Sequence, residues 1–346
     1  MTFQTGIRRL PLTVQTAYGD LLARLEEDSV LALGGTPVLR ERGDRKYWYT
    51  VQRFADRSIE KYIGPDCHDV RTKIRNARRI NEDLKKRDRQ RSRLTRMCIE
   101  GGLPRADAQT GKLLLALARA GIFRLRGVLV GTHAFRCYPA LLGVELSEAI
   151  AVTEDIDIAA FHSVSVALDD HLDPALAVAL KQVGPFIARP NLYQRPTAWR
   201  EPETGIAVEL LTPNEGPDRD DPLELPALGA YAQPLRFLDY LIHQPTQAAI
   251  LYRSGVLVNV PQPARYAIHK LIVATRRGNG DGAKARKDID QAAALISVLC
   301  EDRPDELEES YLEACGRGPS WRQHVEKGLR RLPNPARQAL MKSLAS

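Results

Sequence analysis

The sequence lacks any run of about 18 apolar residues, and this absence excludes a transmembrane helix. The first fifteen residues, MTFQTGIRRLPLTVQ, also lack the apolar core of a signal peptide. Its five cysteines show no C-x-x-C spacing, which favours reduced thiols over a disulfide framework or a zinc site. The seven histidines form no H-E-x-x-H motif. We therefore expect a cytoplasmic protein that makes no use of a membrane.

What the chain does have is enough length for two or three domains. It contains 346 residues, of which 44% are hydrophobic and 27% are charged, as in a typical globular protein. Changes in pattern divide it into an N-terminal region over residues 1–102, a core over residues 103–277 and a C-terminal helical region over residues 278–346. No internal repeat is evident, so each region is expected to have its own role.

The N-terminal region predicts a helix over residues 12–30, a small β-meander over residues 35–64 and a long helix over about residues 69–101. From Arg71 to Arg96 the long helix carries twelve Lys or Arg against three acids. Its net charge of +9 exceeds the +7 of the whole chain, so the remainder carries −2. This basic helix predicts either a surface that binds nucleic acid or a solvated arm, and the charge alone does not decide between them.

The most informative stretch begins at a short apolar run, Val128 to Val130, which predicts a buried strand. Gly131-Thr132 follows at once, and a helix is expected from His133 to Leu142, closed by Gly143. A strand that turns into a helix in this way brings backbone N–H groups to a helix N-terminus. Such a turn suits a phosphate.

Two carboxylates follow in the pattern Asp155-Ile156-Asp157-Ile158. On a strand, alternate residues share a face, so Asp155 and Asp157 would lie on one face and the isoleucines on the other. Paired carboxylates repel each other unless a cation lies between them, and Mg²⁺ prefers such oxygen ligands. The alternative is that the two aspartates belong to a loop or cap a helix.

This order of motifs resembles the DNA polymerase β-type nucleotidyltransferase superfamily. Its signature is an apolar residue followed by Gly and then Gly, Ser or Thr, with a later Asp-apolar-Asp/Glu strand. The resemblance spans about residues 105–300 and extends to an uncharacterised bacterial nucleotidyltransferase-fold family and to toxin-type members. It implies an α+β fold with a mixed sheet flanked by helices over residues 103–277. The gap between Thr132 and Asp155 is longer than in compact members, which implies an inserted turn or strand around residues 144–152.

The resemblance also implies a third carboxylate, for which the best candidate is Glu209 on an expected strand over residues 206–211. By this resemblance Asp155, Asp157 and Glu209 are the catalytic residues and hold Mg²⁺ or Mn²⁺. A nucleoside triphosphate such as ATP would be bound by residues near the Gly-Thr turn and on two later helices: Gly131, Thr132, Arg136, Lys270 and Lys287. Glu209 as a solvent-facing residue and Lys270 as a surface lysine remain alternatives.

These implications predict a metal-dependent transferase that moves a nucleoside monophosphate to a hydroxyl and releases pyrophosphate. The basic helix over residues 71–96 favours RNA as the acceptor. The alternative is a non-catalytic protein of the same fold that binds nucleic acid. His133 and His269 are expected to be structural histidines with satisfied ring nitrogens, and Cys137 is expected in the core.

Overall fold

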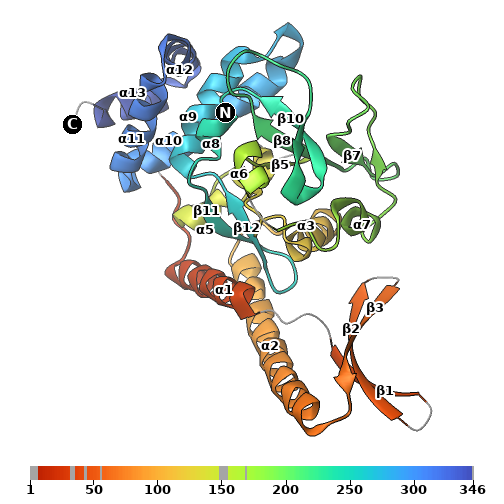
Figure 1. Cartoon of the computed structure of the whole chain (residues 1–346). Helices are drawn as coiled ribbons and strands as arrows, with labels where there is room; N and C mark the ends of the chain where they lie inside the picture. The colour runs from red at the N-terminus through yellow and green to blue at the C-terminus, as the bar shows by residue number, and fades with distance from the viewer. Residues whose placement is uncertain are drawn as a thin grey trace.

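A mixed sheet occupies the centre of the molecule (Figure 1). The computed structural model describes residues 7–31, 36–42, 45–54, 57–147, 155–167 and 170–344. The strands of this sheet come from the middle of the chain: β4 (Val128–Leu129), β5 (Asp155–Ala159), β6 (Ile187–Ala188), β7 (Ala198–Arg200), β8 (Ala207–Pro213), β9 (Leu223–Leu225) and β10 (Ala230–Leu235).

The sheet has the order β4-β5-β8-β10-β9, and β8 lies at its centre. Strand β5 runs parallel to the first part of β8, while β10 runs parallel to its end. Strands β4, β7 and β9 pair antiparallel with β5, β8 and β10. On β5, Ile156 and Ile158 are fully buried, as expected for one face of an alternating strand. Asp155 and Asp157 therefore lie on the opposite face of the strand.

The core also contains these helices: α3 (Ala108–Ala120), α4 (Gly131–Phe135), α5 (Tyr138–Leu142), α6 (His162–Ala167), α7 (Leu176–Lys181), η2 (Pro226–Leu228) and α8 (Leu238–Leu241). Helix α3 begins where the side chain of Asp107 accepts hydrogen bonds from two backbone N–H groups, and it ends at Gly121 in the left-handed conformation. A hairpin of β11 (Thr246–Ile250) and β12 (Val256–Val260) follows the sheet.

The C-terminal part is helical, with α9 (Pro263–Arg276), η3 (Asn279–Asp281), α10 (Gly282–Asp302), α11 (Pro304–Gly316), α12 (Pro319–Arg331) and α13 (Asn334–Ser343). Helix α9 packs against α10, α11 and α12. One cluster of buried apolar side chains extends from Leu113 on α3 to Leu340 on α13. The helices beyond residue 278 therefore share a core with the sheet.

The N-terminal elements are α1 (Leu12–Leu31), β1 (Thr36–Arg42), β2 (Arg45–Phe54), β3 (Arg57–Pro65) and α2 (His68–Glu100). The three strands form a separate antiparallel sheet, and α1 packs along α2. In Figure 1, α2 extends away from the central sheet and carries β1–β3 at its far end. The predicted meander and long basic helix are confirmed. None of the helices in the described ranges is long and apolar enough to span a membrane.

The mixed α+β architecture and the helical C-terminal region agree with the sequence, but four local predictions were wrong. The expected helix over residues 133–142 is two short helices, separated at Arg136 and Cys137. The proline-containing stretches over residues 190–203 and 212–230 predict loops, but the first contains β7 and the second contains β9. The sequence also predicts a helix over residues 234–243, of which only Leu238–Leu241 (α8) is helical, because its start belongs to β10. Residues 148–152 of the expected insertion lie outside the described residues.

Candidate active site

Parallel pairing of β5 with β8 brings the three predicted carboxylates to one area of the sheet. The Cα atoms of Asp157 and Glu209 are partners in the register, and Asp155 is paired with Ala207 two residues earlier. Residues that face each other across neighbouring strands project to the same side of a sheet. Asp155 is exposed, while Asp157 and Glu209 are half-buried. The structure therefore brings Asp155, Asp157 and Glu209 together on one face.

Burial and repulsion by neighbouring carboxylates raise the pKa of Asp157 and of Glu209. Burial, then the charge of Glu209, then that of Asp155 raise the pKa of Asp157 to about 7. The pKa of Glu209 is also raised, mainly by burial and then by Asp155. Arg189, at the end of β6, opposes the rise at Glu209. An unbalanced group of buried acids is costly to keep, so its presence indicates a functional site.

Gly131 lies directly against Asp157. The backbone N–H of Val130 donates to the carbonyl of Asp157 at 2.9 Å, which fixes the end of β4 beside β5. Gly131 then has φ +64°, and a Cβ atom placed on it would be 2.5 Å from Oδ2 of Asp157. No other residue type meets both the conformational and the steric requirement. The glycine of the predicted turn is thus required by its contact with the carboxylate.

A buried tyrosine on α9, Tyr266, forms a hydrogen bond to the backbone of the Gly131 turn. The hydroxyl of Tyr266, whose ring is fully buried, lies 2.9 Å from the carbonyl oxygen of Gly131 and 2.9 Å from Oε1 of Gln291. A hydroxyl has one proton and cannot donate to two oxygens. The proton is therefore donated to one of the two acceptors at a time, either the carbonyl oxygen of Gly131 or Oε1 of Gln291. Helices α9 and α10 thereby position the turn.

Two predicted lysines, on α9 and α10, stand on the carboxylate side of the sheet. Lys270 donates to Oδ1 of Asp288 at 2.6 Å, and Arg277 donates to Oδ2 of the same residue at 2.6 Å. Lys270 and Lys287 both oppose the rise in the pKa of Asp157. Burial and then the charge of Lys270 lower the pKa of Lys287. Lys270 and Lys287 therefore lie close enough to Asp157 to offset part of the negative charge of the carboxylates.

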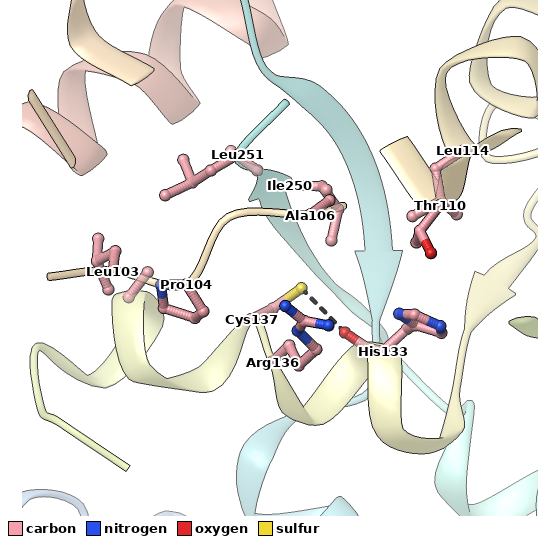
Figure 2. Close-up of a pocket in the computed structure, with 12 residues that line it drawn as sticks. Leu103, Pro104, Ala106, Thr110, Leu114, His133, Arg136, Cys137, Ile250 and Leu251 are labelled. Atoms are coloured by element: carbon pink, nitrogen blue, oxygen red, sulfur yellow. Dashed lines mark hydrogen bonds between the residues drawn. The ribbon is translucent and has the colours of Figure 1, made fainter. Parts of the chain in front are cut away.

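Arg136, predicted to bind nucleotide, contacts a different part of the chain. Its guanidinium donates to the carbonyl of Arg105 at 2.9 Å. It lines a cavity of about 20 Å³ with residues before α3, on α3 to α5 and on β11, but with none of the three carboxylates (Figure 2). A cavity of this size accommodates one water molecule and not a nucleotide. Thr132, the other predicted residue of the turn, is buried within α4.

His133 and His269 are buried, and Cys137 belongs to the core, as predicted. The expectation that both histidines are satisfied is wrong, because Nε2 of His133 and Nδ1 of His269 have no hydrogen-bond partner in the described part of the chain. Burial lowers the pKa of His133 to about 4 and that of His269 to about 3. His133 also lines the small cavity of Figure 2. Both rings are therefore neutral at physiological pH.

The carboxylates do not form a closed metal cage. Among the residues that the structure describes, no three His, Cys, Asp or Glu side chains are grouped so that they could hold a metal ion. The donor set nevertheless has the chemistry that Mg²⁺ takes, since hard cations prefer carboxylate oxygens. Magnesium sites commonly use one or two carboxylates and complete the shell with water and substrate phosphates.

Sequence reasoning missed the residues that surround the predicted ones. Tyr266, Gln291 and Asp288 occupy helical positions that differ little from other buried positions in the sequence. Arg189 lies beside a short strand within a loop-like stretch. Only the spacing of Tyr266 and Lys270, four residues apart on one helix face, gave a local signal that the two act together.

Comparison with known proteins agrees with this geometry. A family model described as nucleotidyltransferase matches residues 108–316, which is more than half of the chain. Searches of the curated proteins and of the solved structures each found no significant match. The match begins at α3 and ends with α11, so it includes the Gly131 turn, all three carboxylates and both lysines. The chain belongs to the nucleotidyltransferase family.

Proposed function

We propose that the core transfers a nucleoside monophosphate from a nucleoside triphosphate to a hydroxyl and releases pyrophosphate, as in the DNA polymerase β-type superfamily. The observation that carries this proposal is the group of Asp155, Asp157 and Glu209 beside Gly131. Three acids that repel each other on one sheet face are stabilised when a cation binds them. A glycine turn in contact with one of them adds a place for the phosphates that such a cation accompanies.

The resident cation we propose is Mg²⁺, with Mn²⁺ as a substitute, held by Asp155, Asp157 and Glu209. When bound, it would draw electron density from phosphate oxygens and lower the pKa of the acceptor hydroxyl. Because the three carboxylates form no closed cage, nucleotide and metal should bind together. Nucleotide phosphates would then supply oxygens that the protein does not.

The rest of the site would bind phosphates by backbone and side-chain donors. Gly131 and Thr132 begin α4, where the first N–H groups of a helix have no partner inside the helix. Lys270 and Lys287 would offset the charge that develops on the leaving pyrophosphate. Lys270 would do so from its ion pair with Asp288, which keeps it in place. Arg136 would have to leave the carbonyl of Arg105 to take part, so we give it the smallest role.

The test is incubation of the purified chain with each labelled nucleoside triphosphate, Mg²⁺ or Mn²⁺, and a mixture of RNA and small hydroxyl acceptors. The Asp157→Asn variant should lose transfer by about a thousandfold or more, because it removes one charge from the metal donor set. Asp305→Asn, an exposed aspartate on α11, is the matched control and should retain full activity. Equal rates for the wild type and Asp157→Asn would refute the assignment.

If no triphosphate is consumed with any acceptor, the catalytic proposal fails. Salt-sensitive RNA binding by the same preparation would then favour the non-catalytic alternative.

A further inference from the structure

Helix α2 has two chemically different faces in its described C-terminal half. Buried or half-buried residues of one face, including Leu94 and Cys98, pack in an apolar cluster with α1. On the same side Arg87 and Arg91 form ion pairs with Asp28 of α1. These two arginines therefore hold α1 against α2. They are not available to a partner molecule without loss of that contact.

The opposite face carries what we call the basic stripe, which consists of Lys85, Lys86, Arg89, Arg93 and Arg96. All five side chains are exposed. None makes a hydrogen bond or an ion pair to another residue within the described ranges. At about 100° per residue the five lie within an arc of about 100°. No acid interrupts that arc between Lys85 and Arg96, since Asp88 lies on another side and pairs with Arg91.

The spacing of the stripe suits a polymer with regularly placed negative charges. Lys85, Arg89 and Arg93 follow one another at four-residue intervals, and Arg96 follows after three. Each four-residue interval rises about 6 Å along the helix and the last one about 4.5 Å, so the stripe is about 17 Å long. A nucleic acid strand carries one charge for each nucleotide and can follow such a row. An amphipathic membrane helix would instead need a free apolar face, whereas the apolar face of α2 packs on α1.

We propose that the basic stripe binds the sugar-phosphate backbone of an RNA strand whose end is the acceptor for the transfer reaction. This rests on the proposed function for the chemistry but not for the binding. The stripe consists of charged side chains alone, so phosphates are its main target and we expect binding to depend only weakly on base sequence. We choose RNA over DNA because the terminal nucleotide of an RNA strand presents both a 2′- and a 3′-hydroxyl as acceptors, whereas that of a DNA strand presents only the 3′-hydroxyl.

The stripe also has a direct connection to the core. Helix α2 ends at Glu100, and the chain reaches the start of α3 and the matched family segment within eight residues. In Figure 1, the C-terminal end of α2 is the end that meets the body of the molecule. A strand bound along the stripe therefore leads toward the core from the side of Arg96.

The experiment measures binding first, without nucleotide. A fluorescent single-stranded RNA of about 20 nucleotides and mixed sequence is titrated with the full chain over a series of salt concentrations. The stripe variant is Arg89→Gln with Arg93→Gln and Arg96→Gln. The matched control removes the same three charges from exposed positions on α12: Arg322→Gln with Lys327→Gln and Arg330→Gln. Glutamine is a good helix former, so both triple variants should fold.

For the stripe variant we expect affinity at about 0.1 M salt to fall at least tenfold. The slope of log affinity against log salt should become shallower by about 2, since each lost phosphate contact on a single strand removes about 0.7. The control triple should match the wild type in slope. Equal losses in both variants would show a dependence on net charge alone and overturn the stripe. Unchanged binding by the stripe variant would overturn it as well.

Labelling is measured second, with labelled triphosphate and Mg²⁺. Wild type should label the RNA, Asp157→Asn should bind it without labelling, and the stripe variant should label it weakly at subsaturating RNA. Transfer to another acceptor but not to RNA, or equal labelling of DNA of the same sequence, would overturn the acceptor assignment alone. Absence of any triphosphate consumption would instead refute the proposed function, and stripe-dependent binding would still support the surface.

Discussion

The candidate active site on the sheet and the basic stripe on α2 are both charged, but two of the three acids of the site are half-buried and the basic side chains of the stripe are exposed. In the site, Asp157 and Glu209 are largely withdrawn from water, and burial raises the pKa of both. On the stripe, side chains such as Arg89 and Arg93 stand in water. Asp157 and Glu209 are constrained by burial and by their neighbours, whereas the side chains of the stripe make no ion pair with another described residue.

The comparison shows that different observations identify the two kinds of surface. A buried, repelling charge destabilises the fold, so its retention already indicates a role. An exposed lysine or arginine has almost no effect on stability, so the number of basic residues says little. For α2 the informative observation is that its two faces differ: the arginines of one face form ion pairs with α1, whereas the basic side chains of the other form none with any described residue. The variants described next test this difference between the two surfaces, in order of decreasing expected effect.

The largest effect is expected where the site tolerates no change, at Gly131. Gly131→Ala would place a Cβ atom 2.5 Å from Oδ2 of Asp157 at a φ of +64°. The turn or the carboxylate must then move, and a shift of about 1 Å at a reacting centre can reduce turnover about a hundredfold. Gly278→Ala is the control, because no atom lies within 4 Å of its added Cβ. Single-turnover transfer rates should separate the two variants; similar rates would show that the turn has no role.

The second effect is the pH dependence of stability. The pKa of Asp157 is raised to about 7 in the fold, so the folded state retains a proton that the unfolded chain releases near pH 4. Stability contributed by the protonated carboxyl is therefore lost as pH rises from about 4 to about 7, by roughly 4 kcal/mol in total. Asp157→Asn should be more stable than wild type above pH 7, and this gain should vanish toward pH 4.

Denaturant unfolding at several pH values measures this difference directly. Comparison of variant with wild type cancels the opposite trend of His133 and His269, whose lowered pKa values favour the fold as pH rises. Mg²⁺ with nucleotide should stabilise wild type more at pH 8 than at pH 5, because protons compete for the same oxygens. A difference between the two proteins that is constant over pH would contradict the assigned shift.

The sequence predicted the parts of this contrast that follow local rules. Alternation in Asp155-Ile156-Asp157-Ile158 predicted a strand with both acids on one face, and Gly131 predicted a turn before a helix. Alternation could not predict that Glu209 would be the register partner of Asp157, because strand pairing depends on tertiary structure. It also missed β7 and β9, which are three residues long and stabilised by their neighbours in the sheet. The basic helix was visible as a run, but its two faces required the position of α1.

The third effect tests the support of the Gly131 turn. Tyr266→Phe removes the hydroxyl that donates to the carbonyl of Gly131, at a cost of about 1–3 kcal/mol in the free energy of unfolding. Tyr138→Phe is the control, since its fully buried ring loses a hydrogen bond from the hydroxyl to the carbonyl of Pro261. Both variants should lose stability, and Tyr266→Phe should lose more because its hydroxyl has two partners, Gly131 and Gln291. Only Tyr266→Phe should lower kcat, by about tenfold, with little change in KM for the acceptor.

Loss of stability without loss of kcat in Tyr266→Phe would assign the hydroxyl a structural role only. An equal loss of kcat in Tyr138→Phe would show that any loss of stability in this part of the core slows the reaction, whichever hydrogen bond is removed.

The smallest effects separate the two faces of α2 with single substitutions. Arg87→Gln removes an ion pair with Asp28 that is partly exposed to water, so the free energy of unfolding should fall by less than about 1 kcal/mol. Arg89→Gln, two residues along, removes no pair and should leave stability unchanged. RNA affinity should show the reverse order, with about a fivefold loss at about 0.1 M salt for Arg89→Gln and almost none for Arg87→Gln. Parallel changes in both quantities would mean that the faces do not differ. The crossed pattern would show that position around one helix determines whether a charge stabilises the fold or binds a partner.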